Sequence, residues 1–171
     1  DLKINDIPQT ALSAIDSLKD LKKCKYITVH ANGGLEMLKA AKKHAKKINK
    51  NLKVLGVTVL TSLNNKSLKE IGHTKKVQQL VLKQSELIKK SGCDGIVCSP
   101  QESKMIRKKF KNLLIITPGI RLPGDNLNDQ ARVMTPKDAF KSKVSGVVMG
   151  RSLTKGNIKL NVKKLIDHLS Q

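Results

Sequence analysis

Short apolar runs of strand length alternate along the chain with longer segments in which apolar residues recur at helical spacing. The apolar runs cover residues 2–4, 26–30, 54–60, 95–99, 113–117 and 146–149. The helical patterns cover residues 11–23, 34–48, 75–90, 101–110, 136–141 and 158–169. Because parallel strands need a long crossover between them, this regular alternation predicts an α/β fold with a parallel sheet and crossover helices.

Each predicted strand is followed by a polar or glycine-containing step, and parallel barrels place their active sites at that end of the strands. The chain shows six strand–helix units, whereas a closed barrel of this type has eight. An open sheet of six strands would leave two unpaired edges, which proteins avoid. We therefore expect residues 1–171 to be a single (β/α)8 TIM-barrel domain that lacks the first two β-α units and contains the last six.

The first six residues place two carboxylates around an ammonium. If residues 2–4 form a strand, Asp1 and Lys3 share one of its faces, and Asp6 follows just beyond its end. A lysine held between two carboxylates stays charged and positioned, as a general acid must be. The alternative is a surface ion-pair cluster, the usual arrangement of such charges on a lysine-rich protein.

The net charge of +21 favours nucleic-acid binding at first sight. However, only four of the 34 basic residues are arginine, and the sequence has no Trp, one Tyr and two Phe to stack on bases. Two of the arginines, Arg121 and Arg151, each lie in a glycine-containing turn after an apolar run, where a guanidinium fork suits a phosphate group. A third, Arg132, is expected at the surface or anchoring a loop rather than on a phosphate.

Three cysteines without CxxC spacing predict neither a disulfide framework nor a zinc site. No apolar run is long enough to cross a membrane, and no signal peptide precedes the first motif. We expect a cytoplasmic protein with reduced thiols, no bound metal and no membrane partner.

The segment from Asp1 to Thr10 resembles the signature of the orotidine 5′-phosphate decarboxylase family, whose bacterial form reads Asp-Leu-Lys-Phe-His-Asp-Ile-Pro-Asn-Thr. Ile4, Asn5 and Gln9 depart from that pattern. Further motifs similar to the family's follow in the family's order over essentially the whole chain: Val29-His30-Ala31 with Gly33-Gly34, Thr58-Val59-Leu60-Thr61-Ser62, Val97-Cys98-Ser99, Thr117-Pro118-Gly119-Ile120-Arg121, Gly124-Asp125 through Asp129-Gln130, and Gly150-Arg151-Ser152-Leu153-Thr154.

The resemblance implies a cofactor-free carboxy-lyase that converts orotidine 5′-monophosphate to uridine 5′-monophosphate, the last step of de novo pyrimidine biosynthesis. It implies that Lys3 protonates C6 of the pyrimidine and that Asp1 lies beside the substrate carboxylate. It also implies a homodimer with shared active sites, in which Asp6 and Thr10 reach the neighbouring subunit's site. The other substrate-binding residues that it implies are Thr61 and Ser99 on the pyrimidine and ribose side, Arg121, Gln130, Gly150 and Arg151 on the phosphate, and Ile7 and Pro118.

Two alternatives stay open at this point. Magnesium-dependent sugar-phosphate decarboxylases and aldolases of the same barrel superfamily share the Asp-x-Lys-x-x-Asp core, but they lack the Ile-Pro-x-Thr continuation and the Thr-Pro-Gly-Ile-Arg segment. A basic, non-catalytic nucleic-acid-binding domain is the alternative from another class. The family's earlier Asp and Lys, on its first two strands, have no counterpart in residues 1–171, so the resemblance leaves open whether these residues are active by themselves.

Overall fold

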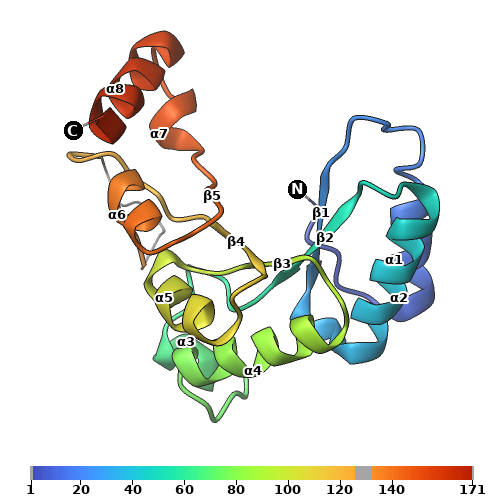
Figure 1. The fold of residues 1–171 in the computed structure, drawn as a ribbon. Coiled ribbons are helices and arrows are strands. Elements are labelled where there is room, and N and C mark those ends of the chain that lie inside the picture. The colour runs from blue at the N-terminus through green and yellow to red at the C-terminus, as the bar shows by residue number, and fades with distance from the viewer. Residues whose placement is uncertain (1, 126–131, 171) are drawn as a thin grey trace. The chain divides into compact units, whose positions relative to one another are not determined.

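A computed structural model describes residues 2–125 and 132–170 as an alternation of strands and helices (Figure 1). By their contacts these residues divide into two compact units. The first unit comprises residues 1–59, 78–97 and 112–114, and the second comprises residues 60–77, 98–111 and 115–171. Each unit is described by itself below.

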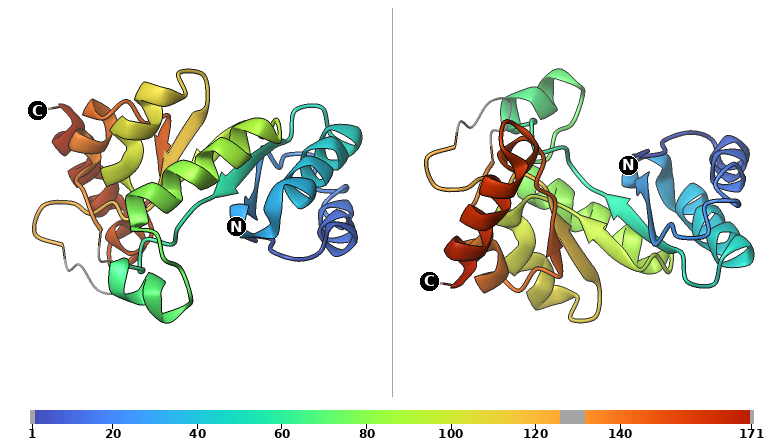
Figure 2. Two further views of the ribbon diagram at one scale, coloured as in Figure 1. Left: turned by 90° about the horizontal axis from the view of Figure 1, so that it is seen from below. Right: turned by 90° about the horizontal axis from the view of Figure 1, so that it is seen from above.

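The first unit is built on three parallel strands, β1 (Tyr26–His30), β2 (Lys53–Val57) and β3 (Gly95–Val97). Helices α1 (Pro8–Asp16) and α2 (Gly34–Ile48) pack side by side (Figure 2), and α4 (Val77–Lys90) leads back to β3. The short 3-10 turn η1 (Ala31–Gly33) joins β1 to α2. The core of the first unit is aliphatic, as the shortage of aromatic residues requires. Its buried side chains include Val29, Leu38, Val54, Ile88 and Ile96.

Close packing and an ion pair fix the strands of this unit. A Cβ on Gly56 of β2 would lie 2.3 Å from Cγ1 of Ile88, so only glycine lets α4 approach this strand. Asp94, just before β3, accepts hydrogen bonds from Nζ of Lys42 at 2.6 Å and from the N–H of Val54 at 2.8 Å. One half-buried carboxylate therefore ties α2, β2 and β3 together at the ends where β2 and β3 begin.

The second unit contains the parallel strands β4 (Leu114–Thr117), from Ile115 onward, and β5 (Gly146–Val147). Its helices are α3 (Asn65–Glu70), α5 (Pro100–Lys109), α6 (Pro136–Lys141), α7 (Arg151–Thr154) and α8 (Ile158–Ser170). Ile106, Ile115 and Ile120 are fully buried in it. Arg107 of α5 donates to the carbonyls of Lys143 and Lys111, and its Nη2 lies 3.2 Å from Oγ of Ser145, just before β5.

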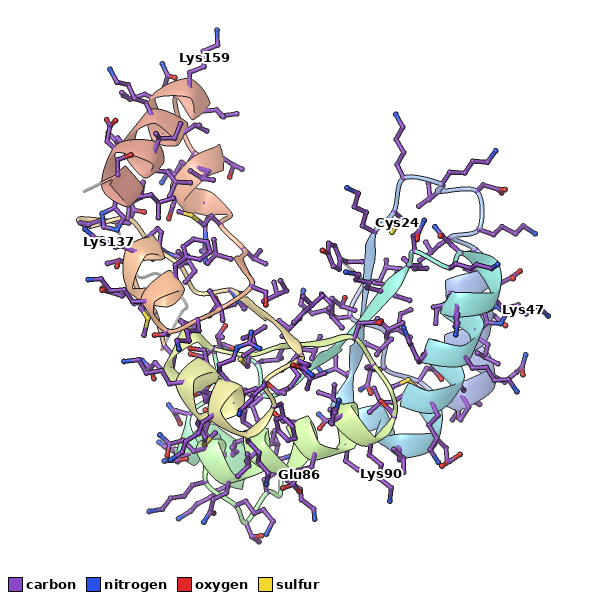
Figure 3. All side chains as sticks on the ribbon, in the orientation of Figure 1. Cys24, Lys47, Glu86, Lys90, Lys137 and Lys159 are labelled. Atoms are coloured by element: carbon purple, nitrogen blue, oxygen red, sulfur yellow. The ribbon has the colours of Figure 1, made fainter. Side chains whose placement is uncertain are left out.

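Many of the lysines that produce the high positive charge lie on helices of both units and are exposed. Figure 3 shows Lys47 at the end of α2, Lys90 at the end of α4, Lys137 on α6 and Lys159 on α8. This scatter agrees with the interpretation of the charge as a property of the solvated helix surfaces rather than of one basic groove. Among the described residues, no helix is both long and apolar enough to span a membrane.

The predicted helices at 34–48 and 136–141 and the predicted strand at 26–30 are confirmed to the residue. The predicted strand at 2–4 is wrong. Only Ile4 pairs, through a single parallel bridge to Val29, and Lys3 has a φ of 49°, which no strand residue adopts. The predicted helix at 11–23 starts earlier, at Pro8, because a proline in the first turn is favourable, and it ends at Asp16.

Candidate active site

Lys3 is held beside the carboxyl end of β1 by its backbone. Its N–H donates to Oγ1 of Thr28 at 2.9 Å, and the next residue, Ile4, bonds to the carbonyl of Thr28 and to the N–H of His30. Among the described non-glycine residues, only Lys3 and Lys143 have φ in the left-handed region. A left-handed lysine costs on the order of 1 kcal/mol, and such residues concentrate at functional sites, where the surrounding bonds hold them in place.

Polar side chains also lie near the carboxyl end of β1, on the strand itself, in the turn that follows it and on α4. Nδ1 of His30 is buried and has no partner among the described residues. Asn32, in the turn that follows, accepts a hydrogen bond from Nε2 of Gln84 at 2.8 Å, and Oε1 of Gln84 is likewise buried without a described partner. Burial lowers the pKa of His30 below its usual value, and the positive charge of Lys3 acts in the same direction.

The lowered pKa of His30 predicts a loss of stability in mild acid. Well above pH 6.5 the imidazole is neutral in both the folded and the unfolded chain, so the pH has no effect through this group. As the pH falls below 6.5, the unfolded chain takes up a proton before the folded one does, and the free energy of unfolding decreases. We expect the urea midpoint to fall between pH 7.5 and pH 5.5, and to fall less in a His30→Gln variant. A His73→Gln variant serves as the control for loss of one imidazole, and an unchanged pH dependence in His30→Gln would contradict the prediction.

The residues that the resemblance assigns to a neighbouring subunit lie at the start of α1 and are exposed. The side chain of Asp6 accepts the N–H of Ile7 at 2.7 Å, Ile7 occupies the N-cap position of the helix without a capping side-chain bond, and Thr10 follows in the first turn. Ile7 is 66% exposed, which is high for a large apolar side chain. Asp1, the other predicted catalytic carboxylate, lies outside the described residues.

In the second unit, Thr61 and Ser99 are both buried after strand ends. Ser99 is the N-cap of α5: its Oγ accepts the N–H of Gln101 at 3.3 Å, and its carbonyl accepts the N–H of Glu102. The sequence Ser-Pro-Gln-Glu explains this helix start, since serine caps and proline in the first turn are both favoured.

Arg121 follows the turn at Pro118 and Gly119, where the glycine has a φ of 76° that other residues rarely adopt. Its side chain is only 8% exposed. Nη1 donates to the carbonyl of Ile120 at 2.9 Å, and Nε is buried without a partner among the described residues. A buried guanidinium with donor capacity left over is suited to an anionic ligand.

Gly150 and Arg151 lie three and four residues after β5. Gly150 is the N-cap of α7, where its carbonyl accepts the N–H groups of Leu153 and Thr154, and Arg151 is the exposed first residue of that helix. The predicted phosphate ligand Gln130 lies outside the described residues. Among the described residues, no group of three His, Cys, Asp or Glu side chains could hold a metal ion.

A buried ion pair was not predicted from the sequence. Nη1 of Arg132 lies 2.5 Å from Oε1 of Glu102, and the two side chains are 9% and 3% exposed. Arg132 is therefore not at the surface, although it does anchor the chain, which was the other half of that expectation. Glu102 lies in a helix rich in charged residues and looks solvated in the sequence, and the one available signal was its place three residues after a capping serine.

Gln84 was also missed. It sits on the apolar stripe of α4, between Val81 and Ile88, and a polar residue on such a stripe is the signal that could have found it. The structure thus groups the predicted residues in two sets. Lys3, Asp6, Ile7 and Thr10 belong to the first unit, and the second unit holds Thr61, Ser99, Pro118, Arg121, Gly150 and Arg151.

Comparison with known proteins gives consistent matches. Residues 1–163 match the family model described as Orotidine 5'-phosphate decarboxylase / HUMPS family. A curated relative from Wigglesworthia glossinidia brevipalpis, named orotidine 5'-phosphate decarboxylase, is 43% identical over 172 residues, which cover 99% of this chain and 74% of that protein. One of the same name from Coxiella burnetii (strain RSA 331 / Henzerling II) is 39% identical and covers 98% of this chain and 72% of its own length.

Solved structures give the same result. The orotidine 5'-phosphate decarboxylase of Lactobacillus acidophilus superposes with a TM-score of 0.81 at 32% identity, over 99% of this chain and 73% of that one. The orotidine 5'-monophosphate decarboxylase of Sulfolobus solfataricus has a TM-score of 0.72 at 16% identity, over 98% and 70%, and supports the fold. The α/β fold of barrel type is confirmed. With the family model matching residues 1–163 and relatives 39% to 43% identical over nearly the whole chain, this chain belongs to the orotidine 5'-phosphate decarboxylase / HUMPS family.

Proposed function

We propose that the protein decarboxylates orotidine 5′-monophosphate to uridine 5′-monophosphate, the last step of de novo pyrimidine biosynthesis. The observation that carries this proposal is that relatives about 40% identical over nearly the whole chain are named for this reaction. The alternatives are weaker, because those names favour the decarboxylase over the sugar-phosphate enzymes and because the lysines are scattered over the helices.

Lys3 is the proposed proton donor. When the bond between C6 and the carboxylate carbon breaks, carbon dioxide leaves and the electron pair stays on C6 as a vinyl carbanion. The Nζ of Lys3 stabilises that charge as it develops and delivers a proton to C6, and solvent later returns a proton to the amine. The hydrogen bonds around Thr28 and Ile4 support this role, since they position the lysine before the substrate binds.

The second unit supplies the proposed substrate grip. Thr61 and Ser99 contact the base and ribose, while Arg121 and Arg151 bind the phosphate together with Gly150 and Gln130. The unused donor of Arg121 supports this assignment. Because the phosphate lies far from C6, its binding energy acts by holding the substrate in position and not through the chemistry itself.

We propose further that the enzyme is a cytoplasmic homodimer with shared active sites. The exposed Asp6, Ile7 and Thr10 support this proposal, since an apolar residue flanked by polar ones at the surface suits an interface. Mixing an Asp6→Ala variant with a Lys3→Ala variant, each nearly inactive alone, should then restore activity, because one of the two sites in a mixed dimer regains both groups. No recovery after subunit exchange has been verified would contradict the shared site.

The reaction itself is tested in the protein at its full natural length. Carbon dioxide release from orotidine 5′-monophosphate should be unchanged after exhaustive EDTA treatment, and uridine 5′-monophosphate should raise the melting temperature. Loss of turnover after EDTA, restored by magnesium, would favour the sugar-phosphate enzymes. Tight RNA binding at physiological salt without any turnover would favour the nucleic-acid-binding alternative.

A further inference from the structure

The Glu102–Arg132 pair is the most buried ion pair among the described residues, and it lies entirely in the second unit. Desolvating two charges is expensive, so a buried pair of this kind is weak evidence for stability alone. Burial raises the pKa of Glu102, and the charge of Arg132 lowers it in opposition. Oε2 of Glu102 has no hydrogen-bond partner among the described residues. Because the pair is costly to bury, a role in joining the segments to which it bonds would explain its presence.

The pair connects three segments that carry predicted substrate contacts. Glu102 lies in the first turn of α5, and its N–H bonds to the carbonyl of Ser99. Nη2 of Arg132 donates to the carbonyl of Leu60 at 2.9 Å, the residue directly before Thr61.

The third connection runs through the backbone after Arg132. Two residues on, Met134 forms a parallel bridge with Ile120. The N–H of Arg121 donates to the carbonyl of Met134, and the N–H of Met134 donates to the carbonyl of Gly119, each at 3.1 Å. The segment that the ion pair fixes therefore includes Met134, to which the backbone of Arg121 is hydrogen-bonded.

We propose that Glu102 and Arg132 are positioning residues that hold Thr61, Ser99 and Arg121 in the arrangement that binds the substrate. The inference rests on the proposed function. Neither residue needs to touch the substrate, because the two act through the segments they join. Lysine would replace Arg132 only in part, since one ammonium on a flexible stem does not hold a carboxylate and a carbonyl in fixed directions as a planar fork does.

The decisive variant replaces both partners, Glu102→Met with Arg132→Met. Replacing a whole buried pair by apolar residues of similar volume leaves no uncompensated charge and generally preserves folding. The matched control is Lys42→Met with Asp94→Met in the first unit, which removes an ion pair that also bonds to the backbone but lies where the strands begin. Arg132→Lys is the conservative variant.

Both double variants are compared with the wild type at full natural length, at temperatures equally far below each melting temperature. We expect the Glu102/Arg132 double variant to raise KM and to weaken binding of uridine 5′-monophosphate by on the order of a hundredfold, the effect of losing one charge-assisted contact to the ligand. Arg132→Lys should fall between it and the wild type. The control should change the melting temperature while leaving KM and nucleotide affinity within about twofold, because the Lys42–Asp94 pair does not position the substrate-binding residues.

Hydrogen exchange provides a readout that does not depend on activity. The amides of Leu63, Gln101 and Arg121 are bonded within the three segments, and they should exchange faster together in the Glu102/Arg132 double variant and not in the control. Equal KM, nucleotide affinity and exchange in the two double variants would overturn the inference. A wild-type protein that neither binds the nucleotide nor turns over would overturn the proposed function, while the exchange comparison would still decide whether the pair couples the three segments.

Discussion

Replacing Lys3 by alanine should lower kcat by on the order of 10⁴-fold, the upper range for loss of a general acid, in the protein at its full natural length. The lysine acts on charge that exists only once carbon dioxide has left, so the affinity for the substrate should largely survive. Single-turnover rates and equilibrium binding of uridine 5′-monophosphate would separate the two effects.

The chain offers a matched control for this variant. Lys143 is also a lysine in the left-handed conformation, with a φ of 59° against 49° for Lys3, but it lies in the turn before β5 and is exposed. Lys143→Ala therefore makes the same change to a comparable backbone without touching the predicted site. Near-normal turnover in Lys3→Ala, or equal losses in both variants, would refute the assignment of Lys3 as proton donor.

Replacing Arg151 by alanine should act mainly on KM. The phosphate is present in both the ground state and the transition state, so loss of a charge-assisted bidentate contact removes binding from both, about 3 kcal/mol or roughly a hundredfold in affinity. Lys155→Ala, at an exposed residue four positions further along the chain, removes one positive charge and controls for long-range electrostatics.

A truncated substrate sharpens this test. With a nucleoside that lacks the phosphate group, added phosphite can occupy the emptied phosphate site and should restore part of the activity in the wild type. It should restore little in Arg151→Ala. Equal restoration by phosphite in both proteins would place the phosphate elsewhere.

The regular elements were predictable wherever apolar spacing was strong. Helix α2 repeats apolar residues at helical spacing between a glycine pair and a polar end, and β1 alternates buried and less buried residues. The segment at Lys3 was not, because its conformation depends on Thr28, a residue 25 positions away whose hydroxyl takes the N–H that a strand would have paired. Secondary-structure propensity depends on neighbouring residues in the sequence, so it carries no information about such a contact.

The predicted site residues came from motifs, and the motifs could not reveal what supports them. Arg121 is identifiable from its turn, but the hydrogen bond from its N–H to the carbonyl of Met134 depends on the tertiary fold. Glu102 and Gln84 are polar residues on helices, which in most sequences are solvated, and here both are buried. Asp1 and Gln130 lie outside the described residues, so their roles stay predictions.

The two ends of the strands carry different duties. Asp94 and Lys42 in the first unit, and Arg107 with Ser145 in the second, tie strands together where they begin. The residues proposed for chemistry lie elsewhere: Lys3 is held beside the carboxyl end of β1, and the proposed substrate contacts of the second unit follow strand ends. The contacts that stabilise the fold and the residues proposed for catalysis therefore lie in separate parts of the protein. Substitutions near the strand ends are expected to change substrate specificity, and substitutions where the strands begin are expected to change thermal stability. Few positions would then affect both properties.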